Sequence, residues 1–168
     1  MALLEVENLD VCFPLRHGEI RAVRDVSFAL ERGERLGIVG ESGAGKSVLA
    51  FSLLKLLSRP GYIAGGRVRF EGRELTTLSD RQLRRIRGNR VAMIFQDPLT
   101  TLNPALTIGR QMIESLKAHR RISERRARAI ALHKLRQVQV SSPEQRFEQY
   151  PHQLSGGLCQ RVVIAIAL

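Results

Sequence analysis

The feature that most constrains this sequence is the segment 40–47, whose letters GESGAGKS satisfy the pattern G-x-x-x-x-G-K-[ST] in full. At average residue usage a chance match occurs on the order of once in ten thousand positions. The apolar run 36–39 precedes this segment, and the largely apolar stretch 48–57 follows it. This order predicts a buried parallel strand, a glycine-rich loop and a helix that begins near Lys46, which together are α/β structure.

A loop of this composition suits a nucleotide polyphosphate, which needs many hydrogen-bond donors at close range. Glycine allows successive backbone N–H groups to point inward, and the helix adds the positive end of its dipole. A plain strand-to-helix turn would explain the glycines but not the Lys-Ser pair. Lys46 is expected to reach the terminal phosphates and Ser47 to ligate Mg²⁺. The predicted nucleotide-binding residues of this loop are Gly40, Glu41, Ser42, Gly43, Ala44, Gly45, Lys46 and Ser47.

The rest of the first third has strand character. Apolar and polar residues alternate at 3–7 and 22–28, which predicts half-buried antiparallel strands with a polar turn at 16–19 between them. A second turn is expected at 31–34. The Arg-Pro-Gly sequence at 59–61 should stop the helix that follows the loop, and residues 65–72 should form a strand of an edge hairpin.

The chain changes character further on. Ser79 and Gln82 have capping-box spacing, which predicts a short basic helix ending at Gly88, and residues 91–95 are expected to form another buried strand. No strand pattern appears after that. Three helices are predicted instead, and their starts are Thr107, Ser123 and Ser142, the last with Pro143 at the first helical position. The second helix should bury a stripe made of Ala127, Ala131, Leu135 and Val138.

Composition limits the class of protein. The chain is 43% hydrophobic and 26% charged, which is typical of one globular domain. The net charge of +11 comes from residues 81–136, which hold 14 basic and 3 acidic residues. Such a segment indicates a nucleic-acid or acidic-lipid surface, or simply a solvated helical face. Two distant cysteines and no signal-peptide pattern favour a reducing compartment. The longest apolar run has seven residues, far short of the roughly 20 that span a bilayer.

Two further segments narrow the class of nucleotide-binding protein. The predicted strand 91–95 ends in Gln96, and the string LSGGLCQR occupies residues 154–161. Here the chain resembles the ABC-transporter ATPase family, because Gln96 matches the family's Q-loop and residues 154–161 match its signature motif. The strings at 37–43, 97–104 and 150–155 are similar to the ATP-binding subunits of bacterial dipeptide and oligopeptide importers and their nickel and glutathione relatives.

The resemblance implies an α/β fold, that of a P-loop NTPase of the ABC ATPase type. It would have an N-terminal antiparallel β subdomain, a partial RecA-like core and an inserted helical subdomain, with the C-terminal part of the core sheet absent. Residues 1–168 would form a single truncated domain. Within it, 1–96 would hold the β subdomain and P-loop core, 97–157 the helical subdomain ending in the signature motif, and 158–168 the signature helix.

The resemblance also implies roles for individual residues. Two ATPase subunits of such proteins hold ATP between the phosphate loop of one and the signature motif of the other. Ser155, Gly156 and Gly157 would then offer a hydroxyl, N–H groups and a helix start to the γ-phosphate. Gln96 is expected to contact Mg²⁺ or the attacking water, and Phe13 to stack on adenine. Without the resemblance, the glycines suit a helix C-cap, Gln96 a solvated strand end and Phe13 the core.

Some positions depart from the family pattern. Leu158 and Cys159 stand where polar or methionine side chains are usual, and Gln139 stands where a helix-ending glycine is common. The acidic pair that follows the signature helix in the family, the D-loop and the switch histidine are not among the 168 residues. The chain as given is therefore expected to bind ATP without hydrolysing it at a family-like rate. The strands predicted at 36–39 and 91–95 should lose sheet neighbours and expose apolar faces, with low solubility or partial unfolding.

The resemblance indicates an ATP-binding subunit that couples ATP binding and hydrolysis to the uptake of peptides or related solutes. The implied partners are a second ATPase subunit, identical or paralogous, two transmembrane permease subunits and, indirectly, an extracytoplasmic solute-binding protein. The expected location is the cytoplasmic face of the inner membrane, where the basic segment 81–136 would face the permease. The alternatives are a catalytically silent ATP-binding remnant and a nucleic-acid-linked ABC ATPase, although no nucleic acid is expected as a partner.

Overall fold

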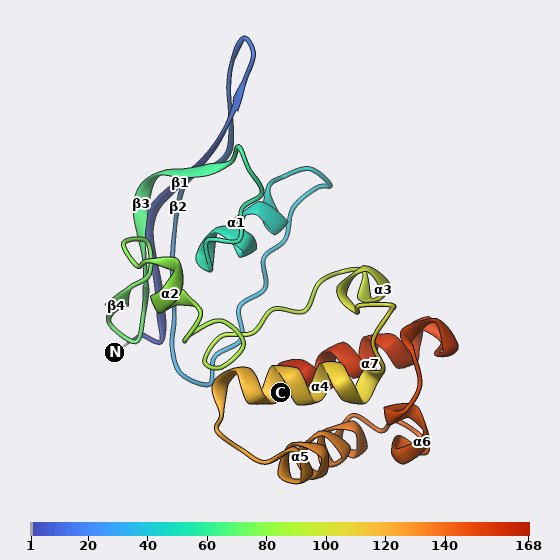
Figure 1. Cartoon of the computed structure of the whole chain (residues 1–168). Helices are drawn as coiled ribbons and strands as arrows, with labels where there is room; N and C mark the ends of the chain where they lie inside the picture. The colour runs from blue at the N-terminus through green and yellow to red at the C-terminus, as the bar shows by residue number, and fades with distance from the viewer. Residues whose placement is uncertain (1) are drawn as a thin grey trace. The chain divides into compact units, whose positions relative to one another are not determined.

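The computed structural model describes residues 2–168, apart from the side chain of Leu99. The chain divides into two compact units, unit 1 ending at Leu83 and unit 2 running from Arg84 to Leu168 (Figure 1). Strands and a short helix after the glycine-rich loop make up most of unit 1, and unit 2 is helical. The predicted change from strands to helices is therefore confirmed. The boundary between the two compact units follows Leu83, earlier in the chain than the boundary expected after residue 96.

Unit 1 contains one antiparallel sheet of four strands, in the order β2-β1-β3-β4. The two strands predicted from alternating residues form a long hairpin, which Figure 1 shows projecting beyond the rest of the sheet. β3 begins earlier than predicted, pairs with β1, and meets β4 in the expected hairpin. The strand bounds are Leu4–Leu15 for β1, Gly18–Leu30 for β2, Tyr62–Phe70 for β3 and Arg73–Glu74 for β4.

Two helices of unit 1 are shorter than predicted. α1 (Lys46–Leu53) starts where expected, but it ends before Lys55, which adopts a left-handed conformation with φ of 52°. The Lys55 ammonium donates to the carbonyls of Thr76 and Leu78, both at 3.1 Å, so a contact distant in sequence favours this early end. α2 (Asp80–Leu83) begins directly after Ser79, the predicted capping residue, whose backbone N–H donates to the Gln82 side chain at 3.0 Å.

The prediction of buried parallel strands at 36–39 and 91–95 is wrong for the described structure. Neither segment pairs with a strand within residues 2–168, apart from one isolated bridge between Val91 and Arg87. A strand needs a hydrogen-bonded neighbour, and these apolar segments have none there. The expected exposure of their apolar side chains is confirmed. Val39 is 93% exposed, and Leu36, Ile38, Ile94 and Phe95 are also exposed.

Unit 2 is a cluster of helices around one apolar core. The predicted starts are confirmed: Thr107 and Ser123 cap their helices by accepting from the N–H three residues on, and Pro143 opens the third. Of the predicted stripe, Ala127, Ala131 and Leu135 are fully buried, and Val138, which follows the last residue of α5, is partly buried. The sequence did not predict α3. The bounds are Pro98–Thr101 for α3, Ile108–His119 for α4, Glu124–Gln137 for α5, Pro143–Phe147 for α6, Pro151–Gln153 for a 3₁₀ turn and Gly156–Ala167 for α7.

Gln139 follows the end of α5 in a left-handed conformation, with φ of 58°. A glycine, which is common at this position in the family, would adopt this conformation without the steric cost that a residue with a Cβ has. The guanidinium of Arg161, on α7, donates to the Gln139 carbonyl at 2.9 Å and to the Val138 carbonyl at 3.3 Å. These bonds tie the turn after α5 to α7.

Candidate functional site

The glycine-rich loop bends sharply before α1. Gly43 and Gly45 have φ of 83° and 85°, in the region that glycine adopts most easily. Gly45 also lies against β2, because a Cβ added to it would stand 2.2 Å from the carbonyl oxygen of Ala22. Only glycine fits this position without moving the strand or the loop. The turn therefore holds the start of α1 close to the sheet.

Lys46, the first residue of α1, turns back over the loop. Its ammonium donates to the carbonyls of Gly40 and Glu41, at 2.8 and 2.6 Å. The backbone N–H groups of Gly43, Gly45, Lys46 and Ser47 donate to no other backbone group in the part of the chain that the structure describes. Free N–H groups, a lysine ammonium and a helix N-terminus together form a site suited to a polyphosphate.

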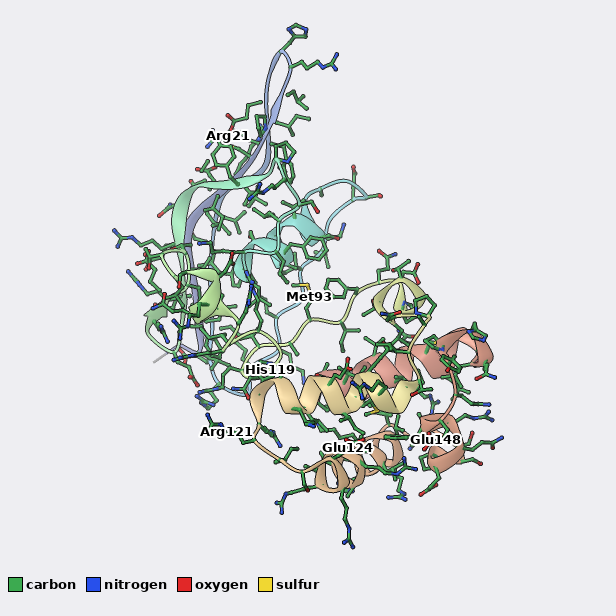
Figure 2. All side chains as sticks on the ribbon, viewed as in Figure 1. Arg21, Met93, His119, Arg121, Glu124 and Glu148 are labelled. Carbon is green, nitrogen blue, oxygen red and sulfur yellow. The ribbon has the colours of Figure 1, made fainter. Side chains whose placement is uncertain are left out.

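A cavity of about 600 Å³ adjoins this loop within unit 1. Its charged lining residues are all basic, and they are Arg21, Arg24 and Lys46. Arg21 is labelled in Figure 2 on the β1–β2 hairpin, and its guanidinium pairs with Asp10 at 2.6 Å. Ile20, Ile38 and Val39 add apolar surface. The residues present therefore fit a nucleotide, with donors for phosphates beside an apolar wall for a base or sugar.

The sequence did not identify the β2 residues of this cavity. Neither Ala22 nor the two arginines of β2, Arg21 and Arg24, which are three positions apart, belongs to a motif in the sequence. Phe13, predicted to stack on adenine, is half-buried on β1, and its ring lies against Gly61, where an added Cβ would be 2.4 Å from a ring carbon. It does not line the described cavity beside the phosphate loop. Its role toward adenine remains a prediction.

The signature segment forms the start of a helix, as predicted. Ser155 caps α7, and its hydroxyl accepts from the Leu158 N–H at 3.4 Å. Gly156 and Gly157 are the first two helical residues, both exposed, with open space where a side chain would stand. Cys159 and Val162 hold the helix on the core of unit 2 and are fully buried. The hydroxyl and the first N–H groups of the helix therefore face outward together.

The Q-loop glutamine lies in an exposed bend between the segment 91–95 and α3. The carbonyl of the following Asp97 accepts from the hydroxyls of Thr100 and Thr101, at 3.1 and 2.8 Å, which fixes the start of α3. Gln96 belongs to unit 2 and the phosphate loop to unit 1, so the contact of Gln96 with Mg²⁺ stays a prediction. Within the described residues, no group of three His, Cys, Asp or Glu side chains forms a metal site.

Comparison with known proteins now decides the family. A family profile described as "ABC transporter" matches residues 23–168. The chain belongs to the ABC transporter family. In this ABC cassette, the matched residues include both the phosphate loop and the signature segment.

Several curated proteins are similar to this cassette over almost its whole length. The oligopeptide transport ATP-binding protein OppD of Bacillus subtilis (strain 168) is 47% identical over 99% of the chain, which covers 47% of that protein. The dipeptide transport ATP-binding protein DppD of Escherichia coli (strain K12) is 46% identical over 100% of the chain and 51% of its own length. The chain thus spans about half the length of the curated relatives it matches.

Solved structures show the same fold. A dimeric bacterial ABC transporter cassette is similar with a TM-score of 0.87 and 28% identity, over 98% of this chain and 68% of that one. A post-hydrolysis dimer of an ATP-binding cassette, bound to ADP and Pi, has a TM-score of 0.84 and 27% identity over the same shares. The chain therefore has the α/β fold of ABC ATPase cassettes.

Proposed function

We propose that this ABC cassette binds Mg·ATP through residues 40–47 and serves as the ATP-binding subunit of a bacterial peptide importer. The observation that carries the first half is the loop geometry, in which left-handed glycines and Lys46 surround free N–H groups at the start of α1. Support for the second half comes from relatives at 46–47% identity that are named oligopeptide and dipeptide transport ATP-binding proteins.

Each residue of the site has a defined task in this proposal. Lys46 exchanges its two carbonyl partners for phosphate oxygens, and Ser47 supplies its hydroxyl to Mg²⁺, which neutralises phosphate charge when bound. Gln96 contacts the metal or a water, and Phe13 contacts the base. Ser155 and the two glycines after it donate to the γ-phosphate of a nucleotide held by a second ATPase subunit.

The proposed assembly contains two ATPase subunits, two permease subunits and, indirectly, a solute-binding protein, at the cytoplasmic face of the inner membrane. The dimeric cassettes among similar structures support the pairing of ATPase subunits. Among residues 2–168, no helix is long and apolar enough to cross a membrane. The permease subunits would supply the spanning segments in this assembly.

A binding experiment tests the nucleotide site. Mg·ATP is titrated into the purified chain and into Lys46→Ala by isothermal calorimetry, with Lys117→Ala as a control that removes an exposed ammonium from α4. Hydrogen bonds to charged groups contribute about 1.5–3 kcal/mol, so Lys46→Ala should weaken binding about 10- to 150-fold. Equal dissociation constants for Lys46→Ala and the unchanged chain would refute the site.

Uptake by cells tests the importer. The Lys46→Ala change is introduced into the chromosomal gene, and uptake of a labelled dipeptide is compared with that of cells carrying Lys117→Ala. Loss of dipeptide uptake in the first strain alone supports the proposal. If nickel or glutathione uptake is lost and dipeptide uptake persists, the cassette serves a different importer. Normal uptake of all three solutes would refute an importer role of this class.

A further inference from the structure

Phe13 lies on β1, the strand between β2 and β3 in the sheet of unit 1 (Figure 1). Its partner across the β1–β2 ladder is Ile20, and residues directly opposite each other project from the same face of a sheet. Ile20 is exposed and lines the cavity beside the phosphate loop. The Phe13 side chain therefore projects from the same sheet face as Ile20, next to this cavity.

On its other side, the Phe13 ring lies directly against the backbone of Gly61, the residue before β3. A Cβ added to Gly61 would stand 2.4, 2.7 and 2.9 Å from three consecutive ring carbons, Cε1, Cζ and Cδ1. Non-bonded carbon atoms pack at about 3.5–4.0 Å, so a side chain at position 61 would displace the ring by about 1 Å. Gly61 does not have the left-handed conformation that favours glycine. The contact with the ring, and not the backbone conformation, is therefore what requires glycine here.

The backbone under the ring is held by hydrogen bonds. The N–H of Gly61 donates to the carbonyl of Ser58 at 2.9 Å, and the next residue, Tyr62, pairs with Cys12 in the β1–β3 ladder. At the start of the same connection, the Lys55 ammonium donates to two backbone carbonyls at 3.1 Å. A substitution at position 61 should therefore move the ring, which rotates about its side-chain bonds, more than it moves the backbone.

An aromatic side chain over a cross-strand glycine also has a purely structural explanation, since such pairs stabilise sheets. The burial along β1 favours an additional role. Val11 and Cys12 are buried, whereas Phe13 is only half-buried. Part of the ring is thus open to a ligand while Gly61 supports another part. An aromatic ring in this situation can stack with any nucleotide base, because every base has a π-face.

We propose that Gly61 is a positioning residue for the nucleotide base. Its backbone, without a Cβ, sets the position of the Phe13 ring and through it the affinity for the base. The inference rests on the proposed function, in which Phe13 contacts the base. It adds a residue that lies outside residues 40–47 and the signature segment, and whose effect on the nucleotide passes through Phe13.

Two ligands separate the base from the phosphates. Mg·ATP and Mg·tripolyphosphate are titrated by calorimetry into the unchanged chain and its variants. Stacking of one base predicts that Phe13→Ala weakens Mg·ATP binding about 5- to 150-fold, and Gly61→Ala should weaken it at least about threefold. Neither variant should change tripolyphosphate binding. The matched control is Gly65→Ala on β3, whose added Cβ would be 3.7 Å from Asp10, an ordinary contact, and which should leave both affinities unchanged.

A double-mutant cycle distinguishes positioning from a general distortion of the sheet. Gly61→Ala should have no further effect on Mg·ATP affinity in the Phe13→Ala background, because the ring that it displaces is then absent. An equal loss in both backgrounds would overturn the inference. Phe13→Ala with unchanged Mg·ATP affinity would remove the base contact from the proposed function and this inference with it. A loss for Phe13→Ala without one for Gly61→Ala would overturn the inference alone.

A measurement on the unchanged chain keeps the inference testable if Gly61→Ala does not fold. Nuclear Overhauser effects are recorded by NMR with saturating Mg·ATP. The Phe13 ring protons should show contacts to the Gly61 Hα protons and to the adenine protons in the same complex. If the contact with Gly61 disappears when Mg·ATP binds, or if no contact with adenine is seen, Gly61 does not position the ring for the base.

Discussion

Replacing Gly45 by alanine tests the link between the phosphate loop and β2. A Cβ at this position stands 2.2 Å from the Ala22 carbonyl oxygen, and the residue has φ of 85°. The left-handed conformation costs a residue with a Cβ about 1–2 kcal/mol. The overlap forces the strand or the loop to move by roughly an ångström, which adds about 1–3 kcal/mol on the scale of overpacked cores. Gly45→Ala should therefore destabilise the chain by about 2–5 kcal/mol.

Gly43→Ala is the matched control for this change. Gly43 has nearly the same φ, 83°, but an added Cβ would have no neighbour within 4 Å. Gly43→Ala should therefore lose only the stability that the left-handed conformation costs a residue with a Cβ, about 1–2 kcal/mol. The lower entropy of the unfolded chain affects both alanine variants alike. Urea unfolding followed by circular dichroism measures both free energies, and Mg·ATP titration reports the site. Equal losses of stability for the two variants would refute the close approach to Ala22.

Three further changes test unit 2. Gln139→Gly should raise the free energy of unfolding by about 0.5–1 kcal/mol in urea unfolding, because glycine adopts this left-handed φ without strain; a loss of stability would contradict the strain. Ser155→Ala should cost about 1 kcal/mol by the same assay, and Ser142→Ala, whose side chain makes no capping bond, should cost less than half of that. Burial raises the pKa of the Cys159 thiol above its ordinary 9.0, so the contribution of the thiol to stability should be complete below pH 9.0 and decline as the pH rises further. Iodoacetamide should label Cys159 only after unfolding. Rapid labelling of Cys159 in the native chain would refute the burial.

Local chemistry made much of unit 2 predictable. Thr107 and Ser123 cap helices through bonds to residues three positions away, and the α5 stripe needs only helical periodicity. The start of α1 was predictable for the same reason. The segment 36–39 was not, because an apolar run indicates burial only if a neighbouring strand exists to pair with it. The end of α1 depends on Lys55 and two carbonyls more than twenty residues away, which no local pattern contains.

The candidate site, too, could be predicted from the sequence only in part. The loop residues 40–47 and the helix start at the signature segment follow from short patterns, and the structure gives them the expected local shapes, with Ser155 as the cap. The contact of Gly45 with β2 and the cavity beside the phosphate loop join residues that are distant in the sequence. Charge counting located the excess of basic residues in 81–136, and the folded chain shows that Arg110, Arg128 and Arg136 among them pair with carboxylates.

The two bonds that Lys46 makes to its own loop have a consequence for measured affinity. Because the ammonium already satisfies the carbonyls of Gly40 and Glu41, binding a phosphate is an exchange of partners and not a simple gain. The ammonium thus also stabilises the conformation of the loop. Lys46→Ala should loosen the loop even without nucleotide, so that limited proteolysis cuts residues 40–45 faster. A calorimetric comparison consequently measures the difference between two sets of bonds, and its enthalpy will understate the strength of the lysine–phosphate contact.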